Sequence, residues 1–291
     1  MAVLIALISG AAHAAWNAPV KQSGKRLGGG ERTATLVVLS VGLVVGLLAL
    51  PTVAWPMGAL AMPTRAVPWV VLAGLGETAY VVSLGIAYSR GDLSLTYAIS
   101  RSTALVVIWP ISALLFGTVP SALAMGATVL VLIGVVLCRP AAAASGVGTR
   151  WSVPWTLATG CAVGLYHAGY KGAVEAGASP IPAFVLALCV AVPLLWTARA
   201  TTGGDGASAR AMFRMPALWA AGALSAASFI LLIVALTTAD SGRMLGVRNA
   251  SVGFAVILAL MMGERPTAVQ WAGLTCLGVG VAVFGWEQFG S

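Results

Sequence analysis

The sequence predicts an all-α membrane protein of ten transmembrane helices, and three observations lead to this fold class. The 291 residues are 59% hydrophobic and 8% charged, with a mean hydropathy of +0.97, whereas soluble domains carry roughly 25% charged residues. Apolar runs of about 20 residues, long enough to cross a bilayer as helices, recur from end to end. The runs show no strand-like alternation, and a backbone in lipid must satisfy its hydrogen bonds internally, so helices are expected.

The ten spans are expected, in chain order, near residues 2–20, 33–50, 67–88, 94–116, 121–138, 153–173, 181–199, 216–238, 241–262 and 267–286. Glycines, prolines and short polar runs separate them, since such residues interrupt helices. They are Gly28–Gly30, Pro51, Pro56, Pro63, Gly91 with Asp92, Pro120, the run 141–148, Pro180, Pro182, Gly203 with Gly204, and Pro266. None of these interruptions is long enough to form a separate soluble domain.

The net charge of +8 is explained by topology rather than by nucleic-acid binding, because most basic residues lie in short loops between apolar runs. With the N-terminus outside, eleven basic residues face inward: Lys21, Lys25, Arg26, Arg32, Arg90, Arg139, Arg150, Arg199, Arg210, Arg214 and Arg265. Three face outward: Arg65, Lys171 and Arg243. The excess of positive charge on inner loops therefore favours both termini outside.

An internal repeat divides the chain into residues 1–140, a linker at 141–152, and residues 153–291. His13 and Trp16 are matched 154 residues later by His167 and Tyr170. The segments 91–121 and 239–267 are also similar, and they align Arg101 with Arg248, Gly117 with Gly263 and Pro120 with Pro266; Gly134 and Gly280 share the 146-residue offset of the last two pairs. Because each half has an odd number of spans, the second half should be inverted, as in many transporters.

Ten spans in two five-span halves resemble the drug/metabolite transporter superfamily, specifically its EamA-like families. The resemblance covers nearly the whole chain. The resemblance is clearest in three segments: AHAAWNAPVK in the first span, YAISRSTALVVIWPISALLFG in the fourth and RNASVGFAVILALMMGERPT in the ninth. It implies that spans one, three, four, six, eight and nine surround a central cavity. It also implies that both termini lie inside, contrary to the loop charges, so the orientation stays open.

Three charged residues fall deep within predicted spans, where each charge costs about 2.5–3.5 kcal/mol and needs a partner or a wet cavity. Arg101 lies in span four with Tyr97 one turn earlier, and Arg248 lies in span nine. Glu77 lies in span three with Tyr80 at i+3 on the same face. A structural ion pair between Glu77 and one arginine would account for two of these charges, but the charge of the other arginine would remain unneutralised. That surplus favours an anionic ligand.

The opening segment SGAAHAAWNAPVK is polar for an apolar helix. A cleaved signal peptide does not explain it, because no basic residue precedes the apolar run. His13, Trp16 and Asn17 form one helical stripe, which His167, Tyr170 and Lys171 repeat. We expect both stripes to line the central cavity. The alternatives are hydrogen bonds to neighbouring helices for the histidines, and for Lys171 a side chain that extends to the lipid headgroups.

The expected function is secondary transport, with export as the expected direction, of a small anionic or zwitterionic metabolite such as an amino acid or organic acid, by alternating access across the inner membrane. The expected substrate-binding residues are Arg101, Arg248, His13, Trp16, Asn17, Tyr80, Tyr97, His167 and Tyr170; the proton-coupling candidates are Glu77, His13 and His167. No cofactor or metal is expected. The expected partners are the small-molecule substrate, the lipid bilayer, and protons or a counter-substrate, with no nucleic acid, in a monomer or homodimer.

Efflux of cationic or lipophilic drugs, with Glu77 attracting the cation, is the alternative transport activity, and the arginine surplus argues against it. An intramembrane enzyme would need a nucleophile and base or a metal cluster. Ser9 lies one turn before His13, but serines in such helices commonly bond their own backbone. A non-transporting scaffold is the remaining alternative. The four cysteines, Cys138, Cys161, Cys189 and Cys276, form no metal motif and are expected to be buried hydrophobic residues.

Overall fold

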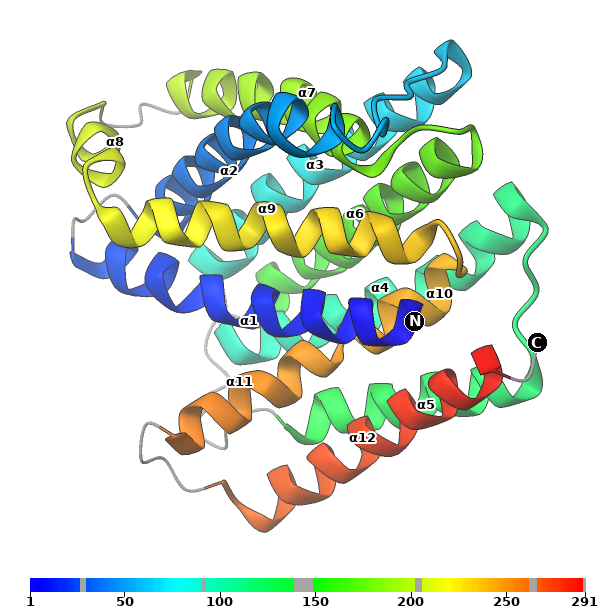
Figure 1. Ribbon diagram of the computed structural model, residues 1–291. Coiled ribbons are helices and arrows are strands. Elements are labelled where there is room, and N and C mark those ends of the chain that lie inside the picture. The colour runs from blue at the N-terminus through cyan, green and yellow to red at the C-terminus, as the bar shows by residue number, and fades with distance from the viewer. Residues whose placement is uncertain (27–29, 91–92, 139–148, 202–205, 262–265, 290–291) are drawn as a thin grey trace.

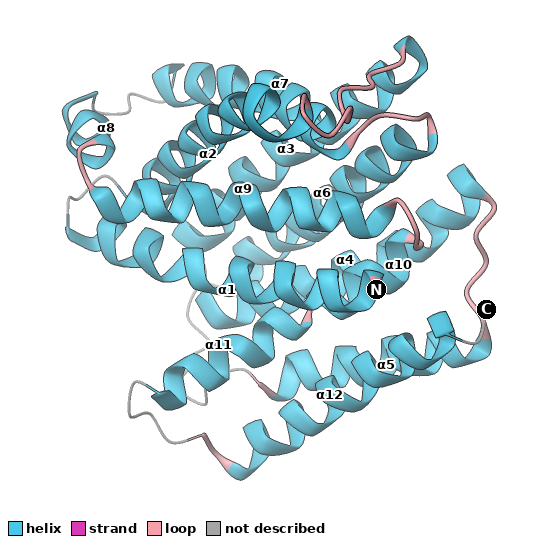
Figure 2. Ribbon diagram, in the orientation of Figure 1, coloured by secondary structure: helices cyan, strands magenta, loops and turns pink. Residues whose placement is uncertain are grey.

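The chain is a bundle of long helices in the computed structural model (Figure 1). The structure describes residues 1–26, 30–90, 93–138, 149–201, 206–261 and 266–289. Within these ranges every regular element is a helix and no strand occurs (Figure 2). The predicted all-α class is confirmed for this part of the chain.

The helices of the first half are α1 (Ala2–Arg26), α2 (Gly30–Ala49), α3 (Val67–Arg90), α4 (Leu93–Phe116) and α5 (Ala122–Leu137). Between α2 and α3 lie a π-helical turn, η1 (Leu50–Ala54), and a 3-10 turn, η2 (Thr64–Ala66). The second half contains α6 (Thr149–Glu175), α7 (Pro180–Thr201), α8 (Gly206–Phe213), α9 (Pro216–Leu236), α10 (Ser241–Arg248), α11 (Ala250–Met261) and α12 (Ala268–Phe289).

Each of the ten predicted spans coincides with helix, with three differences. The ninth span is interrupted at Asn249, which separates α10 from α11. The short helix α8 was not predicted, because its eight residues, which are mostly small or polar, contain no apolar run of membrane-spanning length. Residues 149–152, assigned to the linker, form the first turn of α6, since helix formation extends past the apolar run. The remainder of the predicted linker, 141–148, is outside the described residues.

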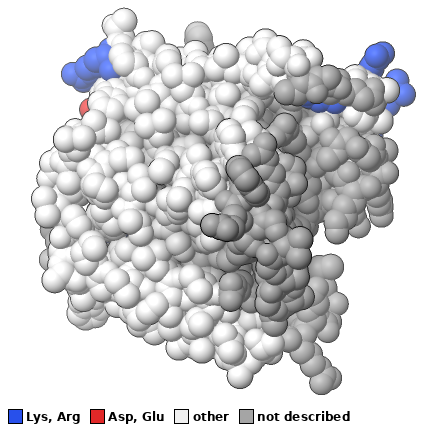
Figure 3. All heavy atoms as spheres, turned by 180° about the vertical axis from the view of Figure 1, so that it is seen from behind, with Lys and Arg blue, Asp and Glu red and all other residues white. Residues whose placement is uncertain are grey.

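Within the part of the chain that the structure describes, six helical segments are long and apolar enough to cross a membrane. They are Thr33–Ala54, Thr64–Ala87, Ala98–Phe116, Pro180–Thr201, Pro216–Leu236 and Ala268–Glu287; Ala2–Trp16 and Ala122–Leu137 are shorter apolar helices. Where Figure 3 draws the described residues, it shows a broad surface of uncharged side chains, with charged side chains near its upper left and upper right. A broad uncharged surface is expected for a protein in a bilayer, where charge is costly.

The helices run roughly parallel to one common axis, and three pairs make the closest packing. These are α3 with α6, α1 with α9, and α5 with α12. α1 begins and α12 ends at the same end of the bundle, on the right of Figure 1, whereas α8 lies at the opposite end. Arg199, Arg210 and Arg214 belong to the α8 end, and Arg65, Lys171 and Arg243 belong to the end with the termini.

The end that carries the termini is held together by polar contacts between connections. Arg65 Nε donates to Ala176 O at 2.8 Å, and Ser179 N donates to Ala61 O at 2.8 Å. The connection between α2 and α3 is thereby joined to that between α6 and α7. These contacts link residues more than 110 positions apart in the chain.

A second group of contacts at the same end involves Lys171 and Arg243. Lys171 Nζ donates to the carbonyl oxygens of Leu236 and Ala239, at 3.0 and 2.9 Å, and so caps the C-terminus of α9. Arg243 forms ion pairs with Asp240 and Glu287, at 3.1 and 3.3 Å. Lys171 is therefore a helix-capping residue in this structure.

The cysteines only partly fit the prediction that they are buried. Cys138 is buried, whereas Cys161 and Cys189 are exposed and Cys276 is intermediate. The prediction was wrong for the two exposed residues because an apolar run in lipid does not tell which of its faces is turned outward. A thiol is tolerated at such a surface as a small, weakly polar group.

Candidate functional site

The buried charged side chains of the described residues are the three singled out in the sequence. Arg101, Arg248 and Glu77 are 3%, 0% and 2% exposed. They come from α4, α10 and α3, which meet inside the bundle with α1, α6 and α9 around them. A surface position in lipid is thereby excluded for all three. Their burial requires polar partners, since burying an unpaired charge is costly.

Both arginines contact the same imidazole, that of His13 on α1. Nη2 of Arg101 is hydrogen-bonded to His13 Nε2, and Nη2 of Arg248 lies 3.2 Å from His13 Nδ1. The indole Nε1 of Trp16 lies 3.3 Å from the same Nδ1. Guanidinium and indole groups only donate, and a neutral imidazole has one acceptor nitrogen. Three donors therefore converge on a ring that can accept at one of its two nitrogens.

Arg248 makes its other polar contacts with neutral groups. Its Nη1 lies 3.4 Å from the hydroxyl of Tyr166 and 3.4 Å from Nε2 of His167, and its Nη2 lies 3.4 Å from Ser228 Oγ. The guanidinium carbon lies 4.6 Å from the ring centre of Phe229. Among the described residues no carboxylate forms an ion pair with Arg248. The groups in direct contact with its charge are therefore neutral dipoles and one aromatic face.

Glu77 is held by a tyrosine of α6. The hydroxyl of Tyr170 donates to Glu77 Oε1, while Oε2 has no hydrogen-bond partner among the described residues. The close approach of α3 and α6 depends on Gly76, where a Cβ atom would lie 2.8 Å from Tyr166 N. The alternative of an ion pair between Glu77 and an arginine is not found among the described residues, where Tyr170 bonds the carboxylate and Tyr166 bonds Arg248.

Seven of the residues predicted for the site have side chains in this region. His13, Trp16, Arg101, His167 and Arg248 form one hydrogen-bonded cluster, and Tyr80 and Tyr170 pack with Tyr166 beside it, at ring-centre distances of 6.0 and 6.3 Å. Asn17 and Tyr97 lie on α1 and α4, but their side chains are outside the described part of the structure. They remain predictions.

Sequence reasoning missed three members of the cluster: Tyr166, Ser228 and Phe229. Tyr166 precedes His167, so it falls one position outside the predicted stripe, and the other two lie in an otherwise apolar helix. Ser228 exchanges two hydrogen bonds with Ser9, at 2.7 and 2.8 Å between each hydroxyl and the other residue's carbonyl. Ser9 therefore bonds α9, and the expectation that it bonds its own helix was wrong.

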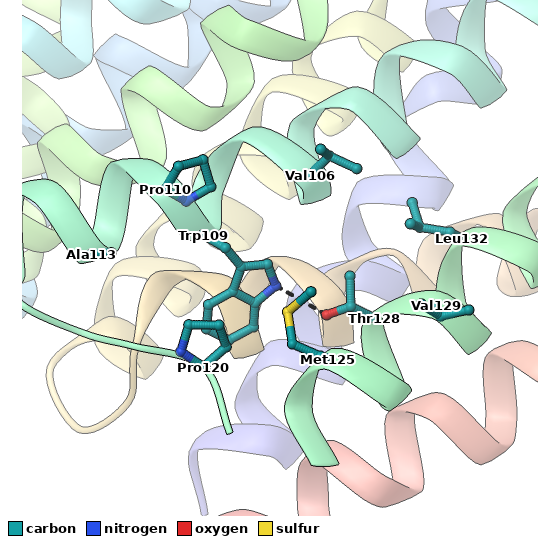
Figure 4. A pocket seen from close by; sticks show the side chains of 9 residues that line it. All are labelled: Val106, Trp109, Pro110, Ala113, Pro120, Met125, Thr128, Val129 and Leu132. Carbon is teal, nitrogen blue, oxygen red and sulfur yellow. Dashed lines mark hydrogen bonds between the residues drawn. The ribbon is translucent and has the colours of Figure 1, made fainter. Parts of the chain in front are cut away.

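A groove with a volume of about 320 Å³ lies elsewhere, between α4 and α5 (Figure 4). Its lining is apolar apart from Thr128, whose Oγ1 accepts a hydrogen bond from Trp109 Nε1 at 3.0 Å. None of the predicted site residues lines it. The described residues also contain no group of His, Cys, Asp and Glu that could hold a metal ion.

These features define a multi-helix membrane protein with a buried polar cluster rich in cations and donors. A solved structure described only as "Crystal structure of protein" has the same fold, with a TM-score of 0.76 over 98% of this chain and 97% of that chain. The two sequences are 16% identical, so the likeness concerns the fold alone. No family model matches the sequence, and no curated protein matches it significantly.

Proposed function

We propose that the protein is a secondary transporter of a small anionic or zwitterionic metabolite, similar to the EamA-like drug/metabolite transporters. The observation that carries the proposal is the convergence of Arg101, Arg248 and Trp16 on one imidazole, that of His13. The Nε of Arg248 has no hydrogen-bond partner among the described residues, and a carboxylate suits such a guanidinium group because it can take two parallel hydrogen bonds from it.

The position of Arg248 strengthens this argument. In a medium of low dielectric constant, the charge of a buried guanidinium acts on a ligand far more strongly than in water. Its described partners are neutral, so a ligand carboxylate is the group that would compensate it. Phe229 and Trp16 then offer apolar surface to the remainder of a small ligand.

Two inverted repeats of five helices are the proposed architecture, and the packing of α5 on α12 supports it. A Cβ atom at Gly134 would lie 2.6 Å from Leu277 Cγ and 2.8 Å from Gly273 O. A Cβ atom at Gly280 would lie 2.8 Å from Val131 Cγ2 and 3.0 Å from Ala127 O. The two sets are related by the same offset of 146 residues, in antiparallel order. A two-fold axis across the helix pair produces such reciprocal contacts.

The other large helix contacts fit the same axis. The repeat pairs α1 with α6 and α3 with α9, so the packing of α1 on α9 corresponds to that of α6 on α3, and both are extensive. Likewise, α2 on α9 corresponds to α7 on α3. We propose that the two halves rock against each other about the central cluster, as in other inverted-repeat transporters.

Efflux of cationic drugs is less consistent with the site. A cation bound at Glu77 would be repelled by the charge of Arg248 nearby, and Tyr170 already hydrogen-bonds this carboxylate. An enzyme would need a nucleophile with a base in reach. The hydroxyl of Ser9 is instead directed at the carbonyl of Ser228, which is not a base.

Transport by the purified chain in lipid vesicles tests the proposal. Vesicles loaded with unlabelled succinate, lactate, L-glutamate or L-alanine are mixed with the same labelled compound outside, and exchange is measured against protein-free vesicles. We expect exchange of at least one carboxylate, inhibited by other carboxylates more strongly than by tetraethylammonium. Exchange of tetraethylammonium alone would establish the cationic alternative, and exchange of no compound would contradict the proposal.

A further inference from the structure

Two tyrosines of α6 connect Glu77 with Arg248. Tyr170 donates to Glu77, and Tyr166, one turn earlier, accepts a hydrogen bond from Arg248 at 3.4 Å. The two rings lie 6.3 Å apart. The buried carboxylate and the buried guanidinium are thereby close neighbours, although no ion pair joins them.

The charges of Glu77 and Arg248 act on each other across this short distance. A negative charge at Glu77 attracts the guanidinium and repels any anion that binds to it. A proton on Glu77 removes that repulsion and leaves Arg248 with a larger uncompensated charge. Because both effects occur in a buried region, water screens them weakly.

Among the described residues, few titratable or charged side chains lie near Glu77. They are Tyr80 on its own helix, Tyr166, His167 and Tyr170 of α6, and, by way of the tyrosines, Arg101 of α4 and Arg248 of α10. Where α7 packs on α3, beside Gly74, it contributes Ala187 and Val190, which are neutral.

The histidines are unsuited to carry the proton. Protonation would turn both nitrogens of His13 into donors directed at Arg101 and Arg248, which are themselves donors. The Nε2 of His167 faces Arg248 in the same way. Glu77, by contrast, keeps Oε2 without a hydrogen-bond partner among the described residues, so a proton there displaces no existing bond.

We propose that the protein binds its anionic substrate together with one proton, which resides on Glu77, and carries both across the membrane in the same direction. This inference rests on the proposed transport function and adds the coupling ion and its residue. By linkage, each partner raises the affinity for the other by the same factor. The affinity for the anion therefore changes by at most tenfold per pH unit, the limit for a single linked proton.

The direction of net flow follows from this coupling. An inward proton gradient of one pH unit supports up to about tenfold accumulation of a monovalent anion, the ratio carried by 1.36 kcal/mol. Export of the anion then occurs when the ratio of its concentration inside the cell to that outside exceeds the ratio that the proton gradient can sustain. A monovalent anion and a proton carry no net charge together, so their transport is insensitive to membrane potential.

Proton movement into vesicles tests the inference. Vesicles that contain the full chain and an internal pH dye receive lactate or succinate outside at equal pH, with the membrane potential clamped by potassium and valinomycin. We expect the wild type to acidify the interior as the anion enters.

Glu77→Gln should keep exchange of the labelled anion within about threefold of the wild-type rate but lose acidification, whereas Glu77→Asp should retain both. Glu175→Gln, which removes an exposed carboxylate of α6, is the matched control and should behave as the wild type.

Three results separate the outcomes. Acidification by Glu77→Gln equal to that of the wild type overturns the role of Glu77. Anion exchange by the wild type without acidification overturns proton coupling while leaving the transport function standing. Absence of anion exchange by the wild-type protein contradicts the transport function. Should Glu77→Gln fail to fold, wild-type binding of lactate, which stays a monovalent anion in this range, decides: an affinity that is constant between about pH 5.5 and 7.5 overturns the inference.

Discussion

Arg248 Nη2 lies 3.2 Å from Nδ1 of His13, although the two residues are 235 positions apart in the chain. This contact joins the first helix to α10, and the Arg101 contact on the other ring nitrogen joins both to α4. One imidazole therefore organises the arginines of both halves of the chain. The proposed binding of a carboxylate depends on this arrangement.

Replacement of either arginine of the central cluster by lysine should lower transport of carboxylates. Arg248→Lys and Arg101→Lys keep the charge but lose the planar fork that binds a carboxylate by two hydrogen bonds. We expect each change to lower carboxylate exchange by at least about tenfold, the effect of 1.4 kcal/mol. Arg199→Lys is the control, because Arg199 is only partly buried and bonds Thr33 and Ser208 at the α8 end. Exchange at the wild-type rate by both central variants would remove the arginines from the binding site.

Alanine at either reciprocal glycine should loosen the packing of α5 on α12. Gly134→Ala and Gly280→Ala place a methyl group within 3.0 Å of the opposite helix, at a cost of about 1–3 kcal/mol in the free energy of unfolding. Gly126→Ala on α5 and Gly278→Ala on α12 are matched controls, since a Cβ atom there meets nothing within 4 Å. Denaturant titration in detergent measures all four. Equal stability of the two sets would contradict the close contact.

A disulfide across the end that carries the termini should stop transport. Ser121 Oγ donates to Glu287 Oε1, which joins the start of α5 to the end of α12. In a background without the four native cysteines, oxidation of Ser121→Cys with Glu287→Cys should abolish exchange, because the proposed mechanism requires this end to open. Reduction should restore it, and each single variant should be insensitive to oxidation. Full exchange by the cross-linked protein would show that this end stays closed throughout transport.

Asp240, in the connection between α9 and α10, should make stability depend on pH. Burial raises the pKa of its carboxyl, an effect larger than the opposing hydrogen bond and charge of Arg243. The folded state thus holds this proton more tightly than the unfolded state. The contribution of Asp240 is complete below the ordinary aspartate pKa and is lost as pH rises through the raised pKa.

Comparison with Asp240→Asn isolates this effect, because asparagine can still cap α10 at Arg243 N. The apparent Tm of each protein is measured at one scan rate between about pH 4 and pH 7. We expect the Tm of the wild type, relative to that of the variant, to fall as pH rises across this range. A relative Tm that rises instead would mean that the ion pair with Arg243 dominates over burial.

The positions of the helices and the charged residues of the site were predictable from the sequence. Apolar runs of membrane-spanning length mark helices whatever their neighbours, and Arg101, Arg248 and Glu77 are conspicuous because charge is costly in such runs. Helix α8 and the interruption at Asn249 were not predictable. Both depend on local packing of small and polar residues, for which the hydropathy pattern carries no signal.

The sequence by itself determined that the chain is helical and apolar, and which charges are buried. Only the tertiary structure decided which groups meet. The helical period determines on which face of a helix a residue lies. Which other helix packs against that face depends on side-chain packing between segments that are far apart in the chain. His13 therefore bonds Arg248 and Arg101, and Glu77 bonds Tyr170 instead of an arginine, because α6 packs directly on α3 and places its tyrosines between the opposite charges.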